Sequence, residues 1–481
     1  MKNKLKISII TLFFFAGLVT TLMLLTKNSF APTSINEITN TSSLVELSMQ
    51  PFWEGNTIYN ESMLPVSYAG GIPESPFLFP YVNIISVKDY KLTTTYTPGV
   101  DWMFLNNKLI LPTGSKIPFL KDTDLTNPSM SAPLDYFHNY QVAVTYTHSG
   151  HWAGPIPSYA GSNLPSSIAK LGSASPLKII LYGDSISVGF NMSGHIGAPP
   201  FLPPWGQLVV ETLKQKYNSN ITFQNQSSSG QNSSWGLTNV DSLVTTQSPD
   251  LVILAFGMND GSQNIVAETY KNNITQIMSQ VKTKNPLAEF ILISPMLPNP
   301  TTSFLGTQST YETALQSLKG PGVAVVNMTS IHKELLKTKK YVDLSGNNLN
   351  HPNDYLGRWY AQSAVALLTI PTLEQLNHLP IKGVSEITYV VENTQKRPIP
   401  DWDTYLSLGF KDGDQVVLPG QLLQSISLGP PIKSVLTPSP TTGDLNGDGK
   451  VNIYDFVKLL NGFNTVYTPD DFTDLLANYG K

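Results

Sequence analysis

The stretch Tyr182-Gly-Asp-Ser-Ile-Ser187 decides how this chain folds. It directly follows an apolar run, Leu177 to Leu181, which has the length of a buried strand. A glycine at the end of a strand lets the backbone bend sharply, so that the next side chains project instead of packing. Open α/β sheets hold their chemistry at the carboxyl ends of their strands. The sequence therefore places the hydroxyl of Ser185 at that edge of a parallel sheet.

Two further polar stretches follow predicted strands and carry N–H donors. The first is Asn225-Gln-Ser-Ser-Ser-Gly-Gln-Asn-Ser233, where a turn at Gly230 can present an unobstructed backbone N–H. The second is Phe256-Gly-Met-Asn-Asp-Gly261, where Asn259 can add a side-chain N–H. Donors of this kind stabilise the oxyanion that develops in acyl transfer.

A base is also available downstream. Asn350-His-Pro-Asn-Asp354 opens a predicted helix from about 355 to 368. A serine is a poor nucleophile unless an adjacent base accepts its proton. The pattern therefore predicts that His351 serves as the base for Ser185.

These four stretches, in this order, resemble those of the SGNH (GDSL-type) hydrolases over residues 175–372. The resemblance implies that Ser185 is the nucleophile and an oxyanion-hole donor. It implies that Gly230 and Asn259 complete the hole and that His351 is the general base and acid. It further implies a flavodoxin-like three-layer α/β/α domain that needs no cofactor for catalysis.

One position departs from the family pattern. The family has an aspartate three residues before the catalytic histidine, and this chain has Asn348 there. An asparagine can hold a ring tautomer but adds no charge to stabilise an imidazolium. Asp354 and Asp343 lie close enough in sequence to substitute, and a Ser–His dyad is the remaining alternative. The favoured hypothesis is Asn348 or a dyad.

Composition describes a loop-rich exported protein. The 481 residues include 34 glycines and 36 prolines but no cysteine, so a disulfide framework is excluded. Charged residues make up 13% and the net charge is −4, which argues against a nucleic-acid partner. Residues 1–31 carry lysines before a long apolar run, as in a signal peptide or a single membrane anchor. The expected location is extracellular, either secreted or tethered to the outer face of the cytoplasmic membrane.

The rest of the chain predicts additional modules. Residues 45–155 alternate as strands and predict an all-β sandwich, with a hairpin turn at Asn106-Asn107. Strands near 177–182, 221–223, 251–256, 290–294 and 323–326 then interleave with helices, which indicates a parallel sheet covered on both faces. Residues 383–432 resemble a small module of bacterial surface proteins, and 433–442 read as an extended linker.

The C-terminal residues 443–481 carry a twelve-residue loop of oxygen donors with Gly449 at its sixth position. Its spacing predicts calcium coordination by Asp444, Asn446, Asp448, the carbonyl of Lys450, Asn452 and Asp455. An aspartate at the twelfth position resembles the dockerin form of the EF-hand. The resemblance implies a helix pair with a cohesin-like or cell-surface partner, although only one ligand loop is present.

Together these features predict a secreted serine esterase that removes acyl groups, most readily acetyl, from a polysaccharide. A lipid or small-ester hydrolase is the alternative within enzymes. A surface adhesion or scaffold protein with a vestigial hydrolase fold is the alternative outside them.

Overall fold

The computed structural model describes residues 41–126, 132–383, 387–411, 414–418, 420–434, 443–445, 450–462 and 469–479. The chain divides into two compact units, each drawn from several parts of the sequence. The first unit comprises Met1–Ala153, Asn191–Pro204 and Leu335–Arg358. The second comprises Gly154–Phe190, Trp205–Glu334 and Trp359–Lys481.

A parallel sheet forms the centre of the second unit. Its five strands run in the order β10-β9-β11-β12-β13. Their bounds are β9 Leu177–Gly183, β10 Ile221–Asn225, β11 Leu251–Ala255, β12 Glu289–Ile293 and β13 Val323–Val326. Numbered along the chain this order is 2-1-3-4-5, which is the flavodoxin-like arrangement. The predicted α/β fold of this region is therefore confirmed.

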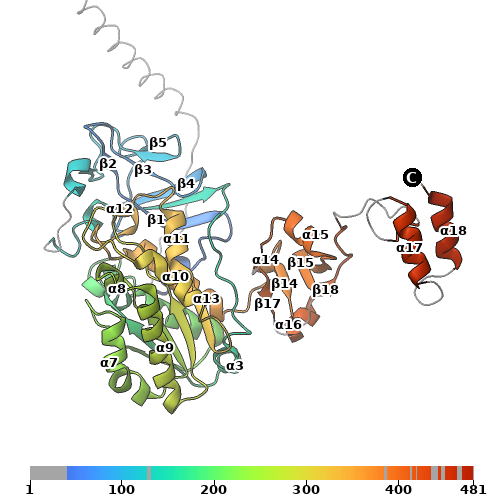
Figure 1. Ribbon diagram of the computed structural model, residues 1–481. Helices are drawn as coiled ribbons and strands as arrows, with labels where there is room; N and C mark the ends of the chain where they lie inside the picture. The colour runs from blue at the N-terminus through green and yellow to red at the C-terminus, as the bar shows by residue number, and fades with distance from the viewer. Residues whose placement is uncertain are drawn as a thin grey trace, which may run out of the picture. The chain divides into compact units, whose positions relative to one another are not determined.

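Strands β11, β12 and β13 are buried throughout, and all their residues except Glu289 are apolar. Strands buried on both faces read as continuous apolar runs, as these do. One face packs on α7 (Ser233–Leu243), α9 (Ala267–Lys284) and α10 (Tyr311–Gln316), of which α7 and α9 lie side by side in Figure 1. On the other face α6 (Trp205–Tyr217) approaches so closely that a Cβ on Gly206 would lie 2.4 Å from Leu181. Helix α13 (Asp354–Leu368) completes the main helices of this region.

The first unit contains the predicted β-rich region. Strands β1 (Thr57–Met63), β8 (Val142–His148) and β4 (Tyr81–Asp89) form an antiparallel sheet. Five short strands form a second sheet in the order β5-β6-β3-β2-β7, with bounds Met103–Leu105, Lys108–Ile110, Glu74–Pro76, Val66–Ser67 and Leu120–Lys121. Asn106 and Asn107 join β5 to β6 with φ of 51° and 59°, as a two-residue hairpin turn requires. The sandwich arrangement itself stays a prediction.

Residues 335–358 join this β-rich region through buried polar contacts. Lys339 Nζ lies 2.5 Å from Glu61 Oε1 on β1, and both side chains are fully buried. The carboxylate of Asp343 accepts hydrogen bonds from Leu64 N at 2.7 Å and from Ser75 Oγ at 2.9 Å. These contacts explain why the segment that contains His351 clusters with the N-terminal residues.

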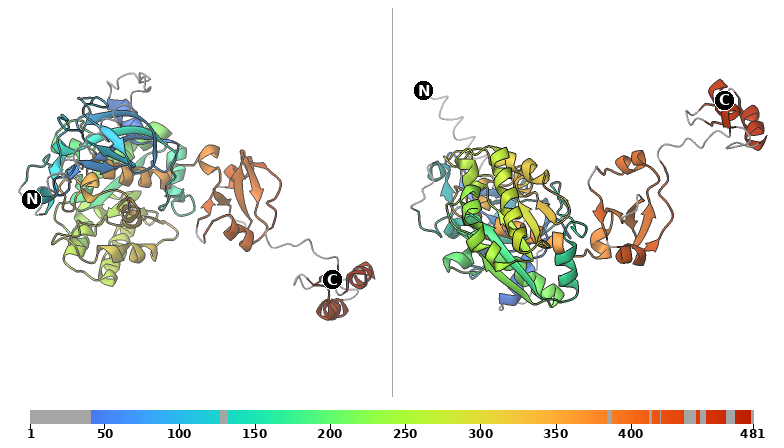
Figure 2. Two further views of the ribbon diagram at one scale, coloured as in Figure 1. Left: turned by 90° about the horizontal axis from the view of Figure 1, so that it is seen from above. Right: turned by 60° about the horizontal axis from the view of Figure 1, so that its bottom comes forward.

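Two smaller modules follow the catalytic region in the sequence. The first contains a five-stranded sheet in the order β17-β14-β15-β16-β18. Its strands are β14 Pro380–Lys382, β15 Thr388–Glu392, β16 Gln395–Pro398, β17 Val416–Val417 and β18 Ser427–Leu428. Helices α17 (Ile453–Gly462) and α18 (Pro469–Asn478) lie beside each other in both views of Figure 2. Val451, Leu459 and Leu475 form the buried contact of this helix pair.

The predicted signal or anchor, residues 1–31, and most of the linker 433–442 lie outside the described residues. Within the described ranges no helix is long and apolar enough to cross a membrane.

Candidate active site

Three of the four predicted motifs follow neighbouring strands of the parallel sheet. Strand β9 pairs with β10 on one side and with β11 on the other. Because the strands are parallel, their carboxyl ends meet at one edge. Ser185 follows β9, Gly230 follows β10 and Asn259 follows β11. The fold therefore brings these three motifs to the same edge of the second unit.

The turn that carries Ser185 depends on close backbone packing. A Cβ on Gly183 would lie 2.5 Å from the carbonyl oxygen of Ala255 on β11, so only glycine fits. Asp184 then caps the short helix α4 (Ser185–Val188) by accepting a hydrogen bond from Ile186 N at 2.9 Å. Ser185 is the first residue of α4 and is 5% exposed.

The two predicted oxyanion donors lie in adjoining turns. Gly230 is exposed and has φ of +77°, so its backbone conformation rather than lack of space favours glycine. Asn259 belongs to α8 (Met258–Ser262), and its Nδ2 donates to Gln231 O at 2.9 Å. That bond fixes the amide beside the Gly230 turn and uses one of its two N–H groups.

Buried carboxyl groups hold these turns in place. Burial, with a smaller contribution from the charge of Asp260, raises the pKa of Asp184 to about 7, although the N–H groups of Ile186 and Met258 oppose the rise. Asp260 accepts hydrogen bonds from the backbone N–H and hydroxyl of Ser233, and burial raises its pKa. Both carboxyl groups therefore serve to fix backbone turns.

His351 lies in the first unit and is 4% exposed. Its Nδ1 is 2.8 Å from Asn191 Oδ1 and 3.0 Å from Asn347 Nδ2. Burial, with a smaller contribution from the nearby His195, lowers the pKa of His351 to about 4. The imidazole is therefore neutral near pH 7, as a general base must be.

Neither aspartate considered as a substitute contacts the imidazole. Asp343 is fully buried, and its carboxylate accepts from Leu64 N, Ser75 Oγ and Lys340 N. Asp354 accepts from Ser193 N at 2.8 Å through Oδ1. In the described structure these carboxylates bind groups other than the His351 imidazole, which gives no support to either one as the triad carboxylate.

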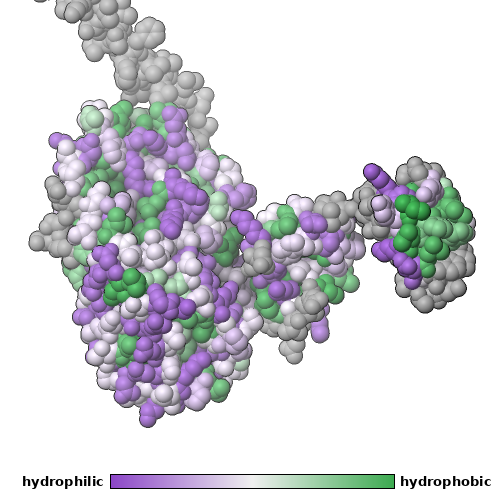
Figure 3. Space-filling view, in the orientation of Figure 1, coloured by the Kyte–Doolittle hydropathy of each residue, from purple (hydrophilic) through white to green (hydrophobic). Residues whose placement is uncertain are grey.

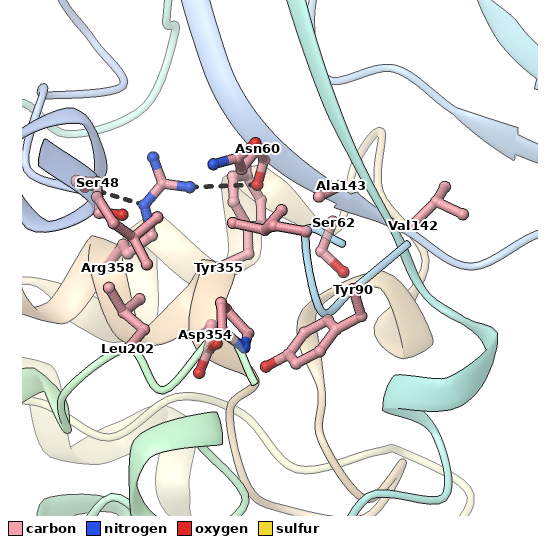
Figure 4. A pocket seen from close by; sticks show the side chains of 13 residues that line it. Ser48, Asn60, Ser62, Tyr90, Val142, Ala143, Leu202, Asp354, Tyr355 and Arg358 are labelled. Carbon is pink, nitrogen blue, oxygen red and sulfur yellow. Dashed lines mark hydrogen bonds between the residues drawn. The ribbon is translucent and has the colours of Figure 1, made fainter. Parts of the chain in front are cut away.

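Asp354 instead lines a cavity of about 30 Å³ (Figure 4). Tyr90 and Arg358 lie around the same cavity, and Arg358 Nε donates to Ser48 O at 2.9 Å. Burial raises the pKa of the Tyr90 hydroxyl well above its usual value, and the nearby charge of Asp354 contributes to that rise. Burial raises the pKa of Asp354, so its environment disfavours the charge that a triad carboxylate would need.

Asn348 occupies the family position of the aspartate and is buried, with φ of +53°. Its Nδ2 lies 3.5 Å from Leu125 O, and its backbone N–H donates to Ser345 Oγ at 2.9 Å. Its predicted role stays a prediction. Asn191, which does contact His351, was missed by sequence reasoning. Its only local signal is an asparagine in a turn, where its φ of +67° is tolerated.

The predicted calcium loop is only partly described. Asn446 and Asp448 lie outside the described residues. Asp455 is fully buried in the first turn of α17 and accepts a hydrogen bond from Asn452 N at 2.9 Å, so it caps the start of that helix. The described part of the chain holds no cluster of three or more acidic, histidine or cysteine side chains that could bind a metal ion. The oxygen donor set fits calcium in kind.

Comparison with known proteins finds similarity in the central region. Residues 181–355 match the GDSL-like Lipase/Acylhydrolase family. An arylesterase of Vibrio mimicus is 29% identical over 105 residues, which are 22% of this chain and 48% of that protein. Thioesterase 1/protease 1/lysophospholipase L1 of Escherichia coli is 29% identical over 120 residues, which are 25% and 51%. The chain thus spans about half the length of the curated relatives it matches.

Solved structures of esterases are also similar. A two-domain esterase active on acetylated mannans is 20% identical with a TM-score of 0.36, covering 45% of this chain and 53% of that chain. A catalytic mutant of an acetylxylan esterase from Geobacillus stearothermophilus is 18% identical with a TM-score of 0.33, covering 40% and 95%. The motif residues after β9, β10 and β11 all lie within residues 181–355, the region that is similar to the GDSL-like Lipase/Acylhydrolase family.

Proposed function

We propose that this protein is an exported serine esterase that removes acyl groups, and acetyl in particular, from a polysaccharide. The observation that carries the proposal is the meeting of the Ser185, Gly230 and Asn259 turns at one sheet edge, within a family match that also includes His351. A nucleophile and oxyanion donors at one edge are what acyl transfer requires.

In the proposed reaction, Ser185 Oγ attacks the ester carbonyl carbon while His351 Nε2 accepts the hydroxyl proton. The N–H groups of Ser185 and Gly230, with Asn259 Nδ2, bind the tetrahedral oxyanion. Collapse of this intermediate expels the sugar hydroxyl, which takes the proton from His351. Water, deprotonated by His351, then attacks the acyl-serine and releases the carboxylic acid.

Ser185→Ala should lower ester hydrolysis by several orders of magnitude, because removal of a nucleophile has an effect of that size. The melting temperature should stay unchanged, since the change removes one hydroxyl. The measurement is acetate release from acetylated xylan and mannan, with an aryl acetate as a general ester substrate. Retention of more than about a tenth of the parental rate would remove Ser185 from the mechanism.

The same assay separates the alternatives. Faster turnover of a phospholipid or of the aryl acetate than of the acetylated glycans would support a lipid or small-ester hydrolase. No turnover of any of them by a folded protein would support the adhesion or scaffold role. The β-rich region and the C-terminal helix pair favour the glycan, since such appended modules suit a large polymeric substrate.

We also propose that the C-terminal module binds calcium and docks to a cohesin-like or cell-surface partner. Ile453, Val457 and Leu460 recur on α17 at helical spacing, and their side chains are 48–57% exposed. Leu476 and Tyr479 are also exposed near the end of the chain. Figure 3 shows apolar residues gathered on this helix pair. An exposed apolar face of this kind marks an interaction site.

A further inference from the structure

We propose that Asn191 is the positioning residue that orients the imidazole of His351 and holds its proton on Nδ1. Asn191 Oδ1 lies 2.8 Å from His351 Nδ1, and both side chains are buried. With the proton on Nδ1, the lone pair stands on Nε2, which is the atom that must accept the serine proton. This inference rests on the proposed esterase function and supplies the orienting group that the family aspartate provides elsewhere.

The direction of the Asn191 amide is fixed by a second hydrogen bond. Asn191 Nδ2 donates to Leu134 O at 2.9 Å, and a carbonyl can only accept. The opposite end of the amide, Oδ1, must therefore face the ring. An amide oxygen accepts and cannot donate, so it pairs only with a protonated Nδ1.

Asn347 is the competing neighbour of the same ring atom. Its Oδ1 accepts three backbone N–H groups of its own turn at 2.9–3.1 Å, so its Nδ2 faces Nδ1 of His351 at 3.0 Å. The same Asn347 Nδ2 also donates to a second acceptor, Asn350 Oδ1, at 3.1 Å. Asn347 is also partly exposed, whereas Asn191 is 2% exposed.

The difference in burial decides between the tautomers. A proton on Nε2 would leave the buried Oδ1 of Asn191 without its donor, which is the costly outcome for a buried polar atom. A proton on Nδ1 removes one acceptor from Asn347 Nδ2, but that amide is partly exposed and keeps Asn350 Oδ1 as an acceptor. The Nδ1–H tautomer is therefore the favoured state of neutral His351.

The backbone around Asn191 is held from several sides. His138 Nε2 lies 2.6 Å from Asn191 O, and Asp354 Oδ1 accepts from Ser193 N at 2.8 Å. A Cβ on Gly346 would lie 2.6 Å from Asn191 Cβ, so a glycine there lets the His351 loop approach. Asn191 is thus fixed against the loop that carries the base.

The test compares Asn191→Asp, Asn191→Gly and Asn348→Asp in the full-length protein. Glycine adopts the positive φ of this position without strain and removes the amide, so it separates loss of the contact from backbone strain. We expect Asn191→Gly to lower kcat by about 10- to 100-fold, the effect of one buried hydrogen bond, with KM within about threefold. Thermal melting of each variant reports whether it is folded.

Asn191→Asp is the decisive variant, because its carboxylate would stand beside Nδ1. An opposite charge at that distance favours the imidazolium, so the acid limb of kcat/KM should move up by about 1–2 pH units. His195, His138 and Asp354 also lie near the His351 ring or near residue 191. They are the same in every variant, so they do not affect the comparison of the acid limbs. Asn348→Asp should leave the acid limb within about 0.3 pH units. The opposite pattern would assign the role to Asn348 and overturn the proposal.

A spectroscopic measurement keeps the inference independent of activity. Long-range ¹H–¹⁵N correlation spectra of the seven labelled histidines, with His351→Gln for assignment, report the tautomer directly. At pH 7 we expect the proton on Nδ1, and a shift toward Nε2 in Asn191→Gly. A proton on Nε2 in the parent protein would overturn the inference. A parent protein with the Nδ1–H tautomer but no turnover of any ester would instead refute only the proposed function.

Discussion

Replacing Gly183 with alanine should destabilise the second unit and slow ester hydrolysis together. A Cβ there would lie 2.5 Å from the carbonyl oxygen of Ala255 and 2.3 Å from Ser187 Oγ. The Ser187 hydroxyl can rotate, but the carbonyl belongs to the paired strand β11. To reach even 3.0 Å, the ends of β9 and β11 must separate by 0.5 Å.

Overpacking of this kind costs about 1–3 kcal/mol, which corresponds to a fall in Tm of about 2–12 °C for a unit of this size. A displacement of half an ångström beside Ser185 should also lower kcat about tenfold. The matched control is Gly172→Ala at the end of α3 (Pro165–Gly172), where a Cβ meets no atom within 4 Å. It should keep or raise Tm and keep the rate. If Gly183→Ala melts within 1 °C of the parent and keeps its rate, the close-packing argument fails.

Two further predictions concern acid and calcium. Burial lowers the pKa of His351 to about 4 and that of His332 to about 3. The unfolded chain protonates its histidines near pH 6.5, so the contribution of His351 to the free energy of unfolding should fall below pH 6.5, by roughly 3 kcal/mol at pH 4. Asp184, whose pKa is raised to about 7, contributes with the opposite sign over the same range. Urea unfolding of the parent and of His332→Gln across pH 4–7 isolates the histidine contribution, because Asp184 is the same in both proteins. We expect the variant to lose less stability towards acid than the parent, and an equal pH dependence in the two would contradict the argument. Calcium should bind the full chain at one site, and Asp444→Ala should weaken that binding, which calorimetry measures. A chelator should leave the rate of acetate release unchanged, and loss of hydrolysis in chelator by a folded enzyme would refute the modular hypothesis.

Sequence patterns predicted the central sheet well, because its strands are short apolar runs bounded by glycine and polar turns. The expected strands at 177–182 and 323–326 correspond to β9 and β13. Helix α7 (Ser233–Leu243) was not predicted, since serine, glycine and asparagine dominate its first turns and its apolar periodicity is weak. The hairpin at Asn106-Asn107 was predicted because asparagine tolerates the positive φ that its turn needs.

The partner of His351 could not be predicted, because the contact joins residues 160 positions apart and follows no local rule. Proximity in sequence made Asp354 and Asp343 possible substitutes beside the favoured Asn348 or dyad, but in the structure both carboxylates accept hydrogen bonds from other groups. Likewise, nothing local reveals that residues 335–358 cluster with the N-terminal region, because this depends on buried pairs such as Lys339 with Glu61.

The contacts of the His351 segment limit how this protein can be re-engineered. Leu134 and His138, from the β-rich region, hold Asn191, and Ser48 O receives Arg358 Nε. A truncated enzyme that begins near residue 175 would lose these supports while keeping every family motif. Exchange of the β-rich region for that of a relative would therefore require matching changes in residues 191–204 and 335–358. The natural site for a fusion or swap lies instead after Ser434, where the chain passes into the predicted linker.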